Sequence, residues 1–212
     1  MKNIHLISPL LIVVIGVLGY RVSLALEEAE HHYNSPVHVH ADFAVYVNEQ
    51  KIDFSQQRYQ SSVGNEKSKV VHVHDGNGNV VHRHGEGVTF AQFLSSLNFT
   101  LTNDCLTVDS GEQYCENDTT AVTLYVNSTP VDDAVSYVPQ EKDRILLVVA
   151  PKNEDAAAQL ASVTNDACIP SGTCPERGTP PVETCGLTCD VTLSQSKITL
   201  KEIVMYVFTG HY

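Results

Sequence analysis

Alternation between apolar and polar side chains is the feature that most restricts how this chain can fold. From position 37 to 47 one set of alternate residues is apolar, namely Val39, Ala41, Phe43, Val45 and Val47. The intervening set contains His38, His40, Asp42 and Tyr46. Successive side chains of a β-strand point to opposite faces, so the pattern predicts a strand whose second face carries both histidines and Asp42.

A β-hairpin is expected between residues 70 and 84. Two β-branched runs, 70–74 and 80–84, flank the sequence Asp-Gly-Asn-Gly-Asn at 75–79. Asp at the first turn position and Gly at the fourth suit a three-residue loop with Gly78 in the left-handed conformation. That register pairs His72 with His82 and His74 with Val80, so the histidines of both runs share one face. A two-residue loop would instead move the second pair to the other face.

The remaining patterns predict further strands and one short helix. Strands are expected at 51–54, 101–108, 122–126 and 145–149. Thr89 suits a helix N-cap with Gln92 at the capping-box position. The apolar residues that follow fall on one stripe: Phe90, Phe93, Leu94 and Leu97. These elements predict an α+β fold with a mixed β-sheet and one packed helix. Residues 122–149 resemble ubiquitin-like β-grasp domains, which implies a β-grasp-like arrangement.

Residues 37–150, about half of the chain, also resemble a group of exported prokaryotic proteins with no established activity. The shared residues are His-Val-His at 38–40, Tyr-Val-Asn at 46–48, His-Val-His-Asp at 72–75, the Val-His-x-His after the turn, and the helix from Gly87 to Leu97. The resemblance implies export and a domain that begins near residue 37.

The N-terminus carries an export signal of its own. Lys2 precedes an apolar run over residues 6–20. This run is shorter than the roughly 20 residues of a spanning helix, unless residues 22–26 extend it. Ser23 and Ala25 are small residues at a possible cleavage spacing. A cleaved signal peptide and an uncleaved N-terminal hydrophobic helix that anchors the chain both fit, and either places the protein at the cell surface or outside the cell.

Cysteine and asparagine patterns agree with export. Six cysteines form an even set that predicts disulfides: Cys105, Cys115, Cys168, Cys174, Cys185 and Cys189. Cys105 and Cys115 flank a turn, which favours a local bridge. The other four allow 168–174 with 185–189, or 168–189 with 174–185. Three Asn-x-Ser/Thr motifs, at Asn98, Asn117 and Asn127, are candidate glycosylation sites.

These features divide the chain into three parts. Residues 1–35 are a signal peptide or membrane anchor followed by an acidic stalk. Residues 36–151 are the histidine-rich α+β domain. Residues 152–212 are a disulfide-braced, proline-rich extension that includes a helical segment near 154–163 and an amphipathic helix over 196–208. The apolar face of the latter helix would pack on the domain or on a protein partner.

The histidine pairs carry the chemistry. Six of the ten histidines occur as His38/His40, His72/His74 and His82/His84. On a strand, residues two apart share a face with Cα atoms roughly 6.5–7 Å apart, a gap that imidazoles can close onto one ion. The sequence therefore predicts a transition-metal site. A solvated row of histidines or a pH-sensitive cluster is the alternative.

Imidazole ligands without nearby thiolates suit zinc or copper, so Cu(II) or Zn(II) is the expected cofactor. Asp42, Asp75 and Glu86 could complete the ligand set or orient a ring, although a turn role also explains Asp75. The formal charge of −12 argues against nucleic-acid binding.

Three functions remain open: metal capture or delivery at the cell surface, a structural or adhesive surface domain or membrane-complex subunit with a bracing metal, and a metalloenzyme. His-x-His with a histidine on a neighbouring strand resembles the zinc sites of carbonic anhydrases and the metal sites of cupin oxygenases. Glu86 is the candidate general base for such an enzyme.

Overall fold

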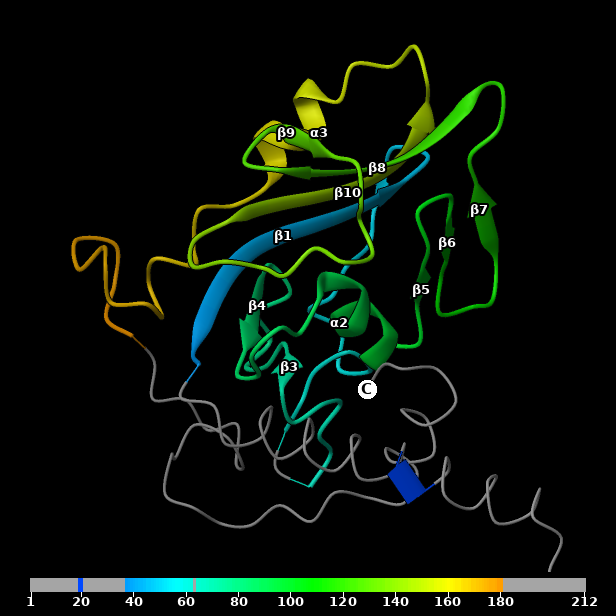
Figure 1. The fold of residues 1–212 in the computed structure, drawn as a ribbon. Coiled ribbons are helices and arrows are strands. Elements are labelled where there is room, and N and C mark those ends of the chain that lie inside the picture. The colour runs from blue at the N-terminus through cyan, green and yellow to red at the C-terminus, as the bar shows by residue number, and fades with distance from the viewer. Residues whose placement is uncertain (1–18, 21–36, 63, 181–212) are drawn as a thin grey trace, which may run out of the picture. The chain divides into compact units, whose positions relative to one another are not determined.

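The computed structural model of the protein describes residues 19–20, 37–62 and 64–180 (Figure 1). The last two ranges belong to one compact unit, Ser35–Thr192. The predicted N-terminal hydrophobic helix, Cys185, Cys189 and the amphipathic helix over 196–208 lie outside the described residues. Within the described ranges, no helix has the length and apolar character needed to cross a membrane.

A mixed β-sheet forms the centre of the described unit, which confirms the predicted α+β class. Its strands lie in the order β3-β4-β1-β10-β8-β9, and β2 also pairs with β1 (Figure 1). β1 and β10 are parallel, and the other pairs are antiparallel. The bounds are β1 Val39–Val47, β2 Gln50–Lys51, β3 Val71–His72, β4 Val80–Arg83, β8 Thr120–Val126, β9 Thr129–Val131 and β10 Arg144–Pro151. The arrangement is not assignable as a β-grasp fold.

A small antiparallel sheet stands beside the first and contains β5 Thr100–Leu101, β6 Cys105–Thr107 and β7 Gln113–Cys115. The predicted continuous strand over 101–108 is therefore wrong. Thr102 breaks it, because its backbone N–H donates to the Cys105 carbonyl and its hydroxyl accepts from the Cys105 N–H. The resulting turn folds β6 back onto β5.

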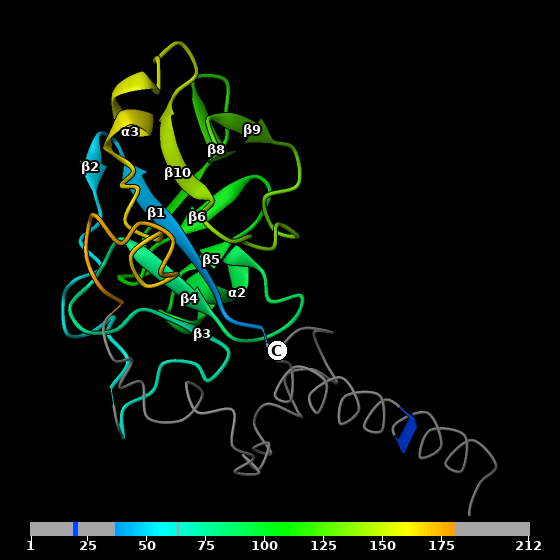
Figure 2. The same cartoon turned by 90° about the vertical axis from the view of Figure 1, so that its left-hand side faces the viewer.

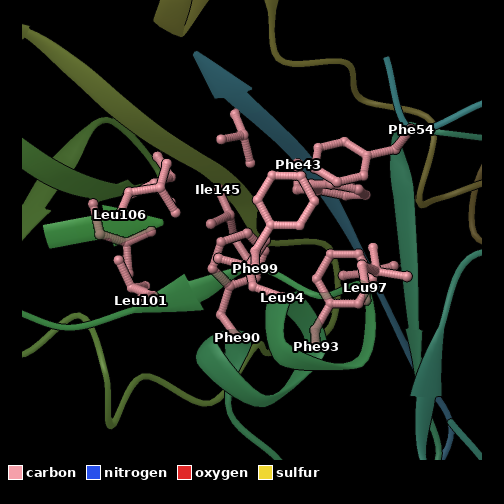
Figure 3. Close-up of a cluster of buried hydrophobic side chains, with 14 of the residues drawn as sticks. Phe43, Phe54, Phe90, Phe93, Leu94, Leu97, Phe99, Leu101, Leu106 and Ile145 are labelled. Atoms are coloured by element: carbon pink, nitrogen blue, oxygen red, sulfur yellow. The ribbon is translucent and has the colours of Figure 1, made fainter. Parts of the chain in front are cut away.

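The helix α2, Phe90–Ser96, begins where the sequence predicts. Thr89 and Gln92 form a reciprocal capping box, so two N–H groups that the helix would leave unbonded are satisfied. The apolar stripe of α2 packs against the face of β1 that carries Ala41, Phe43 and Val45. Figure 3 shows Phe43 and Ile145, from β1 and β10, directed toward Phe90 and Phe93 of α2.

The opposite face of the sheet is covered by the chain that follows β10. The short helix α3, Ala157–Ser162, lies within the predicted helical segment at 154–163. A second apolar cluster there joins Ala44, Leu146 and Val148 of the sheet to Val163 and Leu160. Figures 1 and 2 show α3 and α2 on different sides of β1 and β10. Residues 157–163 are thus packed onto the domain.

The turn that leads into β4 departs from the sequence prediction. The predicted pairing of His72 with His82 is confirmed, but Gly78 is not left-handed. Asp75 and Gly76 have the positive φ values instead, 56° and 73°. Gly78 is needed for space, because a Cβ there would lie 2.2 Å from the backbone N of Ser55. β3 ends at His72, so the predicted pairing of His74 with Val80 is not formed, and His74 instead makes an isolated bridge with Ser61.

Two disulfides are present among the described residues, Cys105–Cys115 and Cys168–Cys174. They confirm the predicted local bridge and the 168–174 bridge of the simpler pairing, whose 185–189 bridge lies outside the described residues. The three candidate glycosylation sites, Asn98, Asn117 and Asn127, are all exposed. Their modification stays a prediction.

Candidate metal centre

Three segments place the histidine pairs on one face of the sheet. His40 of β1 is paired with His82 of β4, which is paired in turn with His72 of β3. Three imidazoles therefore stand in one row across three adjacent strands. Because residues two apart share a face, His38, His74 and His84 flank this row. The alternation that the sequence predicted is what aims all the pairs in one direction.

The six rings form a closed circuit of neighbours. The separations of ring centroids along it are His74–His82 4.1 Å, His82–His40 4.7 Å, His40–His38 4.5 Å, His38–His84 4.6 Å, His84–His72 5.0 Å and His72–His74 5.5 Å. Two imidazoles bound to one tetrahedral ion have centroids roughly 5 Å apart, given metal–nitrogen bonds near 2 Å. Successive rings of the circuit therefore lie near this separation.

Burial distinguishes one of these histidines from the others. His38 is exposed, whereas the other five have between 2% and 6% of their surface accessible. Buried imidazoles need hydrogen-bond partners or a metal ion to offset the loss of water. The cluster is therefore no solvated row, and His38 marks the side on which it reaches solvent.

The tightest group within the cluster is the triad His38, His40 and His82. One ring nitrogen from each lies within 4.8 Å of the others, and no other group of three metal-binding side chains among the described residues is this close. Ligand nitrogens on a tetrahedral zinc ion lie about 3.3 Å apart, so small side-chain rotations would close the triad around one ion. This triad could hold a metal ion.

The ring orientation of His40 is fixed by residues from elsewhere in the chain. Its Nδ1 lies 3.1 Å from the Ser171 hydroxyl, which also contacts Glu141 Oε1 and the Ala167 carbonyl. The hydroxyl has one proton, and the carboxylate and the carbonyl can only accept it. The Ser171 oxygen must then accept from His40 Nδ1. His40 thus carries its proton on Nδ1 and directs the Nε2 lone pair elsewhere.

Two further rings are oriented in the same manner. His72 Nδ1 lies 2.9 Å from the Ser68 carbonyl oxygen, and His74 Nδ1 lies 2.8 Å from Asp75 Oδ2. Both oxygens are acceptors, so each Nδ1 is the protonated nitrogen. Asp75 therefore combines its turn position with the ring-orienting role that the sequence left open.

Asp42, the second carboxylate considered in the sequence, has a different part. It is fully buried, and its Oδ1 accepts from the Thr164 hydroxyl at 2.5 Å and the Asp166 N–H at 2.6 Å. Its Oδ2 accepts from the Ala167 N–H at 3.0 Å. Asp42 shares the face of the histidines, as predicted, but its oxygens hold the chain after α3 in place.

Arg144 completes this attachment. It is the β10 residue paired with Asp42. Its guanidinium donates to the carbonyls of Leu160, Val163 and Thr164 at the end of α3. Together Asp42 and Arg144 dock residues 160–167, and the disulfide loop 168–174 then brings Ser171 to His40. Figure 2 shows this segment, in yellow and orange, beside β1.

Glu86, the nominated base, is exposed on the loop after β4. Its charge acts on Arg83, whose pKa burial lowers while the carboxylates of Glu86 and Glu141 oppose that shift. Arg83 alternates with His82 and His84 along β4, so its side chain belongs to the opposite face of the strand. Glu86 does not belong to the group of close ligand atoms, which consists of His38, His40 and His82.

Sequence reasoning missed Ser171, Glu141 and Ser68, which orient the rings. Ser171 and Glu141 lie about a hundred or more positions from His40, and no local pattern links them to it. The even cysteine count predicted a braced loop near Ser171 but not where that loop packs. Ser68 contributes a backbone carbonyl, a group that every residue type carries.

Comparisons with protein-family models, curated proteins and solved structures find no match for this chain. The geometry alone therefore defines what the site can do. It offers imidazole nitrogens, those of the triad within 4.8 Å of one another, in a buried setting with one exposed edge. Such a set favours a divalent transition-metal ion over calcium or magnesium, which prefer oxygen ligands.

Proposed function

We propose that this domain binds a zinc or copper ion through His38, His40 and His82 and serves in metal capture or delivery outside the cytoplasm. The observation that carries the proposal is the triad, whose ligand nitrogens lie within 4.8 Å of one another. The ring-orienting bond from His40 to Ser171 supports it, because metal-binding histidines usually donate their second N–H to a fixed acceptor.

Imidazole-only ligation narrows the choice of metal. Zinc accepts three histidines and a fourth ligand in a tetrahedral site, and Cu(II) binds more tightly wherever it is available. His38 is exposed, which gives the ion a route to solvent. That route favours reversible loading over permanent retention. The two disulfides agree with an oxidising compartment outside the cytoplasm.

A bracing metal is the second candidate function, and burial of five of the six histidines favours it. An ion on the triad would join β1 to β4, and structural sites are closed to solvent. The rate of metal release separates the two functions. A chelator should remove zinc from a capture or delivery site within minutes at neutral pH. Release that follows only global unfolding would identify a structural ion.

Metal titration of the purified full chain tests the proposal. We expect zinc to bind tightly and to raise the unfolding temperature, because an ion that binds only the folded state stabilises it. The variant His40→Ala/His82→Ala should lose the tightest binding event. His31→Ala/His32→Ala is the matched control, since it removes as many histidines but none of the three His-x-His pairs, and it should bind zinc as the natural chain does.

Unchanged zinc affinity in His40→Ala/His82→Ala, measured by calorimetry and elemental analysis, would refute the triad. A circular dichroism spectrum equal to that of the natural chain shows that any loss reflects missing ligands. Copper is tested separately, in both oxidation states, because the ligand set alone accepts several metals.

A further inference from the structure

Three buried imidazoles remain after the triad is assigned. His72, His74 and His84 have 2%, 4% and 6% of their surface accessible. His72 is the central member of this group, with ring centroids 5.0 Å from His84 and 5.5 Å from His74. Both separations match the roughly 5 Å expected for two imidazoles on one tetrahedral ion. We propose that His72, His74 and His84 form a second metal site, next to the triad.

The proton positions favour this site. His72 Nδ1 donates to the Ser68 carbonyl, and His74 Nδ1 donates to the Asp75 carboxylate. In a neutral ring with Nδ1 protonated, Nε2 holds the lone pair that binds metal. Both rings are therefore set in the ligand tautomer, each by an acceptor of the kind that supports metal-bound histidine.

His74 supplies a second, independent observation. Its Nε2 is buried and has no hydrogen-bond partner within the described part of the chain. A buried acceptor left without a partner destabilises the folded state, so such atoms are rare unless they have a ligand. A divalent transition-metal ion is the ligand that an imidazole lone pair beside other imidazoles accepts best.

A packed histidine stack is the alternative explanation of the same rings. It accounts for the stacked arrangement of His72 and His84, whose planes differ by 28°. It does not account for the fixed Nδ1 protons or for the bare Nε2 of His74, because apolar side chains would fill the same space without buried polar atoms. The metal site explains these last two features.

His82 connects the two sites. Its ring centroid lies 4.7 Å from His40, in the triad, and 4.1 Å from His74, in the second site. Dications bound at the two sites would repel each other, so occupation of the triad should weaken binding at the second site. Two separate dissociation constants are therefore expected.

Elemental analysis of the full chain, equilibrated with excess zinc and desalted, tests the proposal. The natural chain should hold about two zinc ions, whereas His72→Ala/His74→Ala and His38→Ala/His40→Ala should each hold about one. If the natural chain held only one ion and only His72→Ala/His74→Ala lost it, the result would support this site and refute the triad. One ion that is lost only in His38→Ala/His40→Ala would refute this site, as would two ions retained in His72→Ala/His74→Ala.

Asp75→Asn provides a test that leaves every ligand in place. Loss of the carboxylate behind His74 should weaken the second zinc-binding event about 10–100-fold and leave the triad unchanged. Asp53→Asn, an exposed aspartate in a loop, is the matched control. Equal zinc affinities in the two variants, with both folded by circular dichroism, would overturn the role of Asp75 and with it the ligand tautomer of His74.

Discussion

Both faces of β1 are buried, but the first is apolar throughout, whereas the second is polar around His40 and Asp42. Phe43 and Val45 are fully buried against the aromatic core around α2. On the other face, His40 and Asp42 are buried nearly as well, among imidazoles and backbone N–H groups. The same strand therefore serves two environments, one apolar and one polar.

This difference shows that burial alone does not reveal whether a face of the strand contributes to the stability of the fold or to ligand binding. The apolar face stabilises the fold by removing carbon surface from water. Around His40 and Asp42 the second face offers little of this gain, although Ala44 on the same face joins the smaller apolar cluster, and each buried nitrogen or oxygen there needs a partner. Asp42 finds its partners within the chain, whereas the histidines present lone pairs suited to an ion. We expect the two faces to respond differently to substitution and to metal.

The largest effect is expected on the apolar face. Phe43→Ala should lower the free energy of unfolding by about 3–5 kcal/mol, because it removes a fully buried ring and leaves a cavity. Urea unfolding of the metal-free protein measures this loss. The folded fraction should still bind zinc as the natural chain does. A loss below about 1 kcal/mol would show that the core repacks around the gap.

A somewhat smaller loss of stability is expected at Asp42, whose carboxylate is hydrogen-bonded by other residues of the chain. Asp42→Ala should lower the free energy of unfolding by about 3 kcal/mol, because it leaves buried N–H groups of Asp166 and Ala167 without their acceptor. Amide hydrogen exchange over residues 164–174 should rise with it. If Asp42→Ala were no more costly than Asp53→Ala, the carboxylate would not anchor this segment.

The smallest of the three changes in the free energy of unfolding is the stabilisation by bound zinc, and this stabilisation depends on pH. Zinc at about 100 times its dissociation constant should raise the free energy of unfolding by about 2.7 kcal/mol at pH 7.5. Protons compete with the metal for the imidazole nitrogens, so this gain should fall as the pH drops below about 6. Thermal unfolding with and without zinc from pH 5 to 8 measures it. A zinc effect that is constant across this range would contradict imidazole ligation.

Much of the site could be predicted because its ligands sit on regular strands. A period of two aims His38 and His40 the same way, and the register of His72 with His82 follows from the spacing of the two runs around the turn. The capping box of α2 and both bridges were equally local signals. Each depends on residues within about ten positions of one another, which is the range over which sequence patterns are reliable.

The rest depended on contacts between distant parts of the chain. Asp42 looked like a ligand because it shares the histidine face, and only the path of residues 164–167 shows that its oxygens are already engaged. Gly78 looked like a turn glycine, yet its role is set by the close approach of Ser55. The break at Thr102 arises from hydrogen bonds that apolar patterning does not register.

The path of the chain after β10 has a consequence for dissecting this protein. A fragment that stopped at residue 151, where the predicted domain ends, would retain every strand of the described residues and all six imidazoles. It would lack Ser171, and with it the acceptor of the His40 ring proton. The shortest fragment able to reproduce the native ligand geometry must therefore extend through Cys174. The disulfide-closed loop 168–174 then places the Ser171 hydroxyl beside His40, a residue some 130 positions earlier in the chain.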